Sequence, residues 1–236
     1  MLQVLQRNVI TPLVDFIYPP LCWGCENRLT NGDSKICSTC WQSFPKVNLG
    51  DARWNEFREK FRSEGFVEDF ISCFVFEKEG KLQNVIHLLK YQGVKSLGIL
   101  LGREVGKLMI SEEKFSSANF LIPVPLHNLK RRERGYNQSD YICKGISDIT
   151  NIPFNNSILR RKKYTQSQTL LNIEERKQNV GDAFEANSKS LGEIRGKSCI
   201  LVDDVITTGS TINACASVLR KHGAERVLAA SVALAH

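Results

Sequence analysis

An acidic pair and a hydroxyl-rich loop stand close together near the end of the 236-residue chain. Asp203 and Asp204 come first, and Thr207 to Thr211 follows with the sequence Thr-Thr-Gly-Ser-Thr. Backbone N–H groups at the start of a helix hold phosphate, and hydroxyls add further donors. Two acids would repel that phosphate, so they need another partner, either the vicinal hydroxyls of a sugar or a Mg²⁺ ion shared with a polyphosphate. The pattern predicts a site for a ribose 5-phosphate.

A strand and a helix would position this site. Cys199 to Val202 is apolar and too short for a helix, which predicts a buried parallel strand that ends at the acids. Ile212 to His222 has apolar residues at helical spacing, and Gly223 ends it. No Gly-Lys-Ser/Thr follows the loop, so it is not a Walker A P-loop. The alternative is an ordinary strand-turn-helix, in which the acids form a turn and a threonine caps the helix.

Four of the eight cysteines form two Cys-x-x-Cys pairs, Cys22 with Cys25 and Cys37 with Cys40. Each pair can present two thiolates to one ion, and two pairs complete a tetrahedron, which predicts a structural zinc site. A turn at 31–33 would fold one pair back on the other. Disulfides are the alternative, and the paired spacing favours zinc. The other four cysteines lie in apolar stretches and are expected in the core: Cys73, Cys143, Cys199 and Cys215.

The composition is that of a folded globular protein, with 42% hydrophobic and 24% charged residues. A net charge of +7 suggests polyanionic partners, either phosphates or nucleic acid. No apolar run is long enough to span a membrane. Residues 1–18 are amphipathic at helical spacing and lack a following cleavage site, so we expect a packed helix in a cytoplasmic protein rather than a signal peptide.

Three regions are expected: residues 1–50 as an N-terminal helix with the zinc module, 51–67 as a connecting helix, and 68–236 as the main α/β domain. In the connecting helix, Trp54, Phe57 and Phe61 form an aromatic stripe that we expect to pack on the protein, with a single-stranded nucleic acid surface as the alternative. In the main domain we expect a strand at 69–77, a short strand within 119–126 that runs into a proline-stiffened turn, and helices at 80–91, 97–110 and from 137 onward.

A basic segment follows the strand and turn at 119–126. It contains Lys130, Arg131, Arg132 and Arg134 before Gly135. A flexible cationic loop at the carboxyl end of a strand suits a pyrophosphate group. The alternative is a solvated run of charge. We rank Arg134 first as a pyrophosphate ligand, followed by Arg131 and Arg132.

The motifs resemble a known family. Ile200 to Thr211 resembles the PRPP-binding motif of the type I phosphoribosyltransferases. Three other stretches resemble the ComF/GntX family of phosphoribosyltransferase-like proteins: Leu88 to Gly93, Pro123 to Gln138, and Thr165 to Phe184. Together with the cysteine module, the resemblance covers nearly the whole chain.

The resemblance implies a type I phosphoribosyltransferase fold, a mostly parallel sheet flanked by helices, with a small N-terminal zinc module. It also implies the ligand set. Catalysis is expected from Asp203, Asp204 and Arg134. PRPP, carried with Mg²⁺, is expected to contact the following residues: Lys90, Arg131, Arg132, Asp203, Asp204, Thr207, Thr208, Gly209, Ser210 and Thr211. Tyr164 to Val180 takes the place of a hood that covers the acceptor.

Three functions remain open at this point. The first is an enzyme that transfers phosphoribosyl from PRPP to an unknown nitrogenous acceptor and releases pyrophosphate. The second is a PRPP-binding protein without turnover. The third is a single-stranded DNA-binding protein. The family association implies a role in natural competence and DNA uptake, which no residue of the chain demonstrates.

Overall fold

The computed structural model describes residues 19–30, 34–162 and 183–235. The predicted N-terminal helix, the turn at 31–33 and the predicted hood lie outside these residues. A four-stranded parallel sheet in the order β1-β6-β5-β2 forms the centre. Its strands are β1 (Asp69–Phe76), β6 (Arg226–Ala235), β5 (Ser198–Ile206) and β2 (Phe120–Pro123). The predicted α/β class with a parallel sheet is confirmed.

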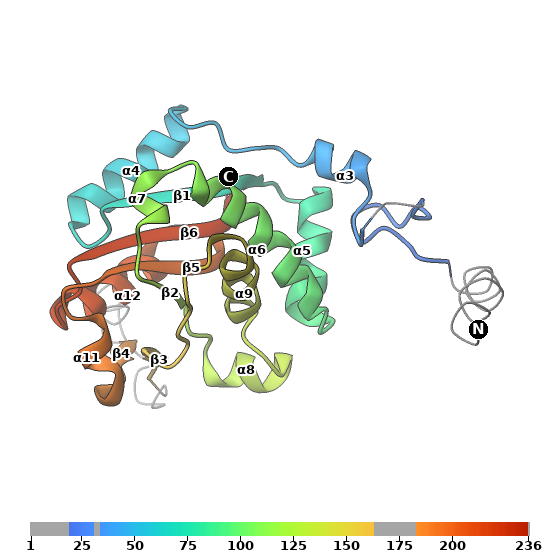
Figure 1. Ribbon diagram of the computed structural model, residues 1–236. Coiled ribbons are helices and arrows are strands. Elements are labelled where there is room, and N and C mark those ends of the chain that lie inside the picture. The colour runs from blue at the N-terminus through green and yellow to red at the C-terminus, as the bar shows by residue number, and fades with distance from the viewer. Residues whose placement is uncertain (1–18, 31–33, 163–182, 236) are drawn as a thin grey trace, which may run out of the picture.

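Helices cover both faces of the sheet (Figure 1). One face carries α5 (Lys81–Tyr91), α6 (Lys95–Ile110) and α9 (Gln138–Thr150), and the other carries α4 (Ala52–Glu64) and α12 (Ser210–Lys221). Residues of β5 alternate between the two cores. Ile200 and Val202 face the α6 and α9 side, whereas Cys199 and Leu201 face the α12 side. β5 is buried on both faces, as its continuous apolar run predicts.

Shorter elements complete the described chain. They are α3 (Ser38–Ser43), α7 (Glu113–Ser116), α8 (Asn128–Arg134), β3 (Leu159–Arg161), β4 (Phe184–Ala186), the 3₁₀ turn η3 (Ser188–Ser190) and α11 (Leu191–Ile194). β3 and β4 pair antiparallel as a separate ribbon. Within the described residues, no helix is long and apolar enough to cross a membrane.

The cysteine module is packed onto the main domain (Figure 1). Cys22, Ile36, Cys40 and Phe44 belong to the same buried cluster as α5 and α6. The chain leaving the module then runs along the free edge of β1. Val47 N–H donates to the Cys73 carbonyl at 3.1 Å, and Val75 N–H donates to the Pro45 carbonyl at 2.7 Å. The module and the sheet therefore share one core, and the limits at residues 50 and 67 stay predictions.

Helices α6 and α9 cross in direct backbone contact, which two glycines permit. A methyl group on Gly102 would overlap the Ile142 carbonyl oxygen, and one on Gly145 would overlap the Ile99 carbonyl oxygen. This close crossing holds α9 against the sheet, and the N-terminal end of α9 lies at the site described below.

We therefore expect Gly102→Ala to destabilise the protein by roughly 3 kcal/mol, because the added methyl group forces two backbones apart. Urea unfolding followed by circular dichroism measures this free energy. Gly192→Ala is the control, since a methyl group there meets open space. Equal stability of the two variants would contradict the close crossing.

Candidate functional site

The carboxyl ends of β5 and β2 meet at one edge of the sheet. Pro123 pairs with Val202, so the segments after residues 123 and 202 leave the sheet side by side. From β2 the chain continues through α9 on one face, and from β5 it continues through α12 on the other. Two neighbouring strands whose connections depart to opposite faces form a topological switch point, the usual position of a ligand crevice in parallel sheets.

The acidic pair lies at this switch point, within the last residues of β5 rather than after its end. Asp203 is partly buried and Asp204 is only 4% exposed. Asp203 Oδ1 accepts hydrogen bonds from the Asp204 N–H at 2.9 Å and from the Ser139 hydroxyl of α9 at 3.3 Å. The acids are therefore held by the strand and by the first turn of α9.

Lys90, at the end of α5, supplies the opposite charge. Its Nζ lies 2.9 Å from Asp204 Oδ2, as a close ion pair rather than an aligned hydrogen bond. Burial and the neighbouring Asp204 charge raise the pKa of Asp203 to about 7, while Lys90 and the hydrogen bond from Ser139 act against this rise. One cation thus compensates two adjacent carboxylates only in part.

The hydroxyl-rich loop follows immediately. Gly209 adopts the left-handed conformation (φ 75°), and α12 begins at Ser210, two residues before the predicted start at Ile212. The Thr208 hydroxyl lies 3.0 Å from the Ser210 hydroxyl, and the side chains of Thr207, Thr208 and Ser210 are exposed. The free N-terminal end of a twelve-residue helix therefore opens beside the acids.

The basic segment is not a loop, and that part of the prediction is wrong. Residues 128–134 form helix α8, because straight-chain basic residues favour helix and Gly135 ends it in the left-handed conformation. The His127 side chain caps its start by accepting from the Leu129 N–H at 3.3 Å.

The helix separates the predicted arginines. Arg134 lies beside the end of α5, with its guanidinium 4.8 Å from the Tyr91 ring centre and 3.2 Å from Gln138 Oε1. Lys90 and Tyr91 are consecutive, so α5 places one residue at the acids and the next at Arg134. Arg131 instead lines a cavity of about 220 Å³ near the β3–β4 ribbon, together with Asp140 and Arg161. Arg132 is exposed and makes no ion pair with a described carboxylate.

Three contacting residues were missed from the sequence. Nothing in the sequence around Ser139 or Tyr91 indicates a role in the site, apart from their positions next to the recognised motifs. Lys60 of α4 donates to the Thr208 carbonyl, across a separation that no local pattern reveals. The predicted aromatic stripe of α4 is confirmed as a packing surface, since Trp54, Phe57 and Phe61 are buried against Phe70 of β1.

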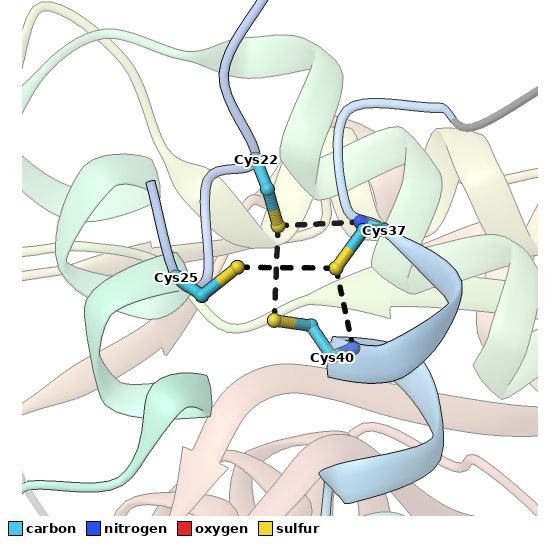
Figure 2. Close-up of side chains that lie close together, drawn as sticks. All are labelled: Cys22, Cys25, Cys37 and Cys40. Carbon is cyan, nitrogen blue, oxygen red and sulfur yellow. Dashed lines mark hydrogen bonds between the residues drawn. The ribbon is translucent and has the colours of Figure 1, made fainter. Parts of the chain in front are cut away.

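The four paired cysteines converge as predicted (Figure 2). The Sγ atoms lie within 4.8 Å of one another, with Cys22 and Cys40 at 3.7 Å and Cys25 and Cys37 at 3.9 Å. A disulfide needs about 2.05 Å, whereas tetrahedral zinc with Zn–S of about 2.3 Å gives S···S separations of about 3.8 Å. The donor set fits a structural zinc ion.

Backbone donors support the same assignment. Cys22 Sγ accepts from the Gly24 N–H at 3.3 Å and from the Cys37 N–H at 3.2 Å. Burial raises the pKa of both Cys22 and Cys40, and at Cys22 these N–H groups act in the opposite direction and lower the pKa of the thiol. Burial raises the pKa of the remaining thiols, Cys73, Cys143, Cys199 and Cys215. Cys143, Cys199 and Cys215 are buried as predicted, whereas Cys73 is only partly buried at the edge of the core.

Comparison with known proteins finds two matching domain families in different parts of the chain. A phosphoribosyl transferase domain matches residues 145–236, and a double zinc ribbon domain matches residues 13–49. Competence protein F of Haemophilus influenzae is 42% identical over 107 residues, which cover 45% of this chain and 46% of that protein. The chain thus aligns with about half the length of that relative.

Two further similarities extend over more of the chain. The DNA utilization protein YhgH of Escherichia coli K12 is 25% identical over 226 residues, covering 89% of this chain and 94% of that protein. The solved glutamine PRPP amidotransferase of B. subtilis has a TM-score of 0.43 and 21% identity, covering 61% of this chain and 30% of that one. The chain is a homologue of competence protein F and YhgH with a phosphoribosyl transferase domain and a double zinc ribbon, which confirms the resemblance seen in its motifs.

The cysteine geometry predicts one zinc ion per chain, and elemental analysis of gently purified protein measures it. Cys25→Ser should lower the zinc content and unfold the N-terminal module, because metal binding supplies folding energy. Limited proteolysis detects the unfolding. Cys73→Ala is the control, since Cys73 lies outside the cluster and should leave zinc binding intact. Zinc-free wild-type protein would contradict the assignment.

The raised pKa of Asp203 predicts a pH dependence of stability. Between about pH 4 and pH 7 the folded state binds more protons than the unfolded state, so the free energy of unfolding should fall as pH rises. Asp203→Asn keeps the acceptor for Ser139 and removes the charge. It should flatten this dependence and stabilise the ligand-free protein at pH 7.5 by on the order of 1–3 kcal/mol. Urea unfolding at pH 5 and 7.5 measures the free energy of unfolding of the wild type and the variant. An equal change with pH in both proteins would contradict the prediction.

Proposed function

We propose that the protein binds PRPP at the switch point between β5 and β2 and transfers its phosphoribosyl group to a nitrogenous acceptor, with release of pyrophosphate. The observation that carries the proposal is the order of groups along one edge of the sheet. Asp203 and Asp204 lie among the last residues of β5, and the 207–211 loop leads into α12. Lys90 pairs with Asp204, and Arg134 lies against Tyr91, the residue after Lys90. The phosphoribosyl transferase domain match over residues 145–236 supports the same chemistry.

Each group has a role in this proposal. The 207–211 loop holds the 5-phosphate through backbone N–H groups and hydroxyls. Asp203 and Asp204 accept hydrogen bonds from the ribose hydroxyls. Mg²⁺ arriving with the pyrophosphate would neutralise part of its charge, and the same carboxylates would hold the water around the ion.

Catalysis would come from positioning and charge stabilisation. The bond from C1 to the pyrophosphate oxygen breaks, its electron pair leaves with pyrophosphate, and the acceptor nitrogen bonds to C1. Arg134 forms no ion pair with a described carboxylate, so its charge is available to the leaving group. The carboxylates stabilise positive charge that develops on the ribose, and no covalent nucleophile is needed. Of the lower-ranked arginines, Arg131 is reassigned to the neighbouring cavity.

A role with DNA is the second candidate function, supported by the relatives' names and by the net charge of +7. Single-stranded DNA binding of electrostatic origin should weaken steeply with salt and should survive loss of both Asp203 and Asp204. PRPP binding without turnover would instead show the ligand affinity and no pyrophosphate release with any nucleobase or amine acceptor tested.

The double variant Asp203→Ala with Asp204→Ala should weaken PRPP binding at least about tenfold, because charge-assisted hydrogen bonds contribute about 1.5–3 kcal/mol each. Isothermal titration calorimetry measures the affinity. The control is Glu112→Ala with Glu113→Ala, a consecutive acidic pair at the start of α7 and far along the chain from the loop. Unchanged affinity in the Asp203 and Asp204 variant would refute the site assignment.

A further inference from the structure

We propose that Lys60 is a positioning residue for the phosphate loop, a role that rests on the function proposed above. Lys60 belongs to α4, which lies outside both matched domain segments, 13–49 and 145–236. Its ammonium nevertheless donates to the Thr208 carbonyl, in the middle of the 207–211 loop. α4 therefore contributes to the site and is more than a connection between domains.

The contact fixes the direction of one peptide group. In a trans peptide the C=O and the following N–H point in opposite directions. Because Lys60 holds the Thr208 carbonyl toward α4, the Gly209 N–H points away from α4. Among the described residues, that N–H has no hydrogen-bond acceptor. It is therefore held open for a phosphate oxygen at the start of α12.

α4 also closes the outer side of the loop by contact. A methyl group on Gly209 would lie 2.9 Å from the Phe61 ring, and Gly209 has φ 75°, so position 209 admits only glycine without strain. Phe61 is 1% exposed and its ring lies 5.4 Å from that of Phe70 on β1. The residue after Lys60 is thus anchored to the sheet, which fixes the backbone of α4 beside the loop.

The charge of Lys60 is also available to the site. Lys60 is only partly exposed, and it forms no ion pair with a described carboxylate. Its ammonium carries three donors, of which the Thr208 carbonyl uses one. A phosphate dianion at the loop therefore gains both an oriented N–H and a nearby positive charge.

Substitutions of Lys60 separate these contributions, with ribose 5-phosphate as a probe for the loop and inorganic pyrophosphate as a probe for the Arg134 side. Lys60→Met should weaken ribose 5-phosphate binding about tenfold, because it removes a charge-assisted hydrogen bond. Lys60→Arg restores a charged donor and should recover most of the affinity. Pyrophosphate binding should change by less than about twofold in both variants.

Arg62→Met is the matched control, because it removes an equal charge from an exposed position on the same helix. Calorimetry gives the affinities, and thermal unfolding verifies that each variant is folded. Wild-type affinity for ribose 5-phosphate in Lys60→Met, or an equal loss in Arg62→Met, overturns the role of Lys60 and leaves the proposed function standing. Failure of the wild type to bind either PRPP or ribose 5-phosphate overturns both.

Discussion

Two adjacent carboxylates at the end of a doubly buried strand are the constraint around which the rest of the site is built. Such a pair is costly to bury unless it meets a cation and hydrogen-bond donors. The structure supplies these from three elements that are distant in the sequence. Lys90 comes from α5, the Ser139 hydroxyl comes from α9, and the N–H of Asp204 comes from β5 itself. α5 and α9 must therefore reach the same edge of the sheet.

The glycine crossing of α6 and α9 and the buried face of α5 meet this requirement. Gly102 and Gly145 let α9 lie close against α6, and the apolar face of α5 packs into the same core, including Leu89 next to Lys90. The Tyr136 hydroxyl donates to the Leu89 carbonyl and so attaches the segment after α8 to the end of α5. The C-terminal end of α5 thus both supplies the positive charge beside the two carboxylates and positions Arg134.

Much of this arrangement could be predicted from sequence because its signals are local. One continuous stretch contains these signals. The apolar run Cys199 to Val202 predicts a strand, the acids after it mark a candidate site, and the hydroxyl-rich loop precedes a helix. The Cys-x-x-Cys spacing of the paired cysteines predicts that their four thiols converge on one point, and they do. Residues 128–134 were predicted as a loop because their charge suggested exposure, whereas helix propensity and Gly135 favour a short exposed helix. The contact of Lys60 with Thr208 spans 148 positions, and the tertiary packing of α4 brings the two together.

The strip of chain that leaves the cysteine module has a consequence for how molecules of this protein meet one another. Residues 45–47 occupy the outer edge of β1 through the bonds at Val47 and Val75. An uncovered edge strand offers a row of N–H and C=O groups to any other strand, and β1 is rich in phenylalanine. The four thiols that gather the module therefore also keep this edge occupied. Loss of an ion held by these thiols would be expected to loosen the strip and to expose the edge of β1 to strand-to-strand association.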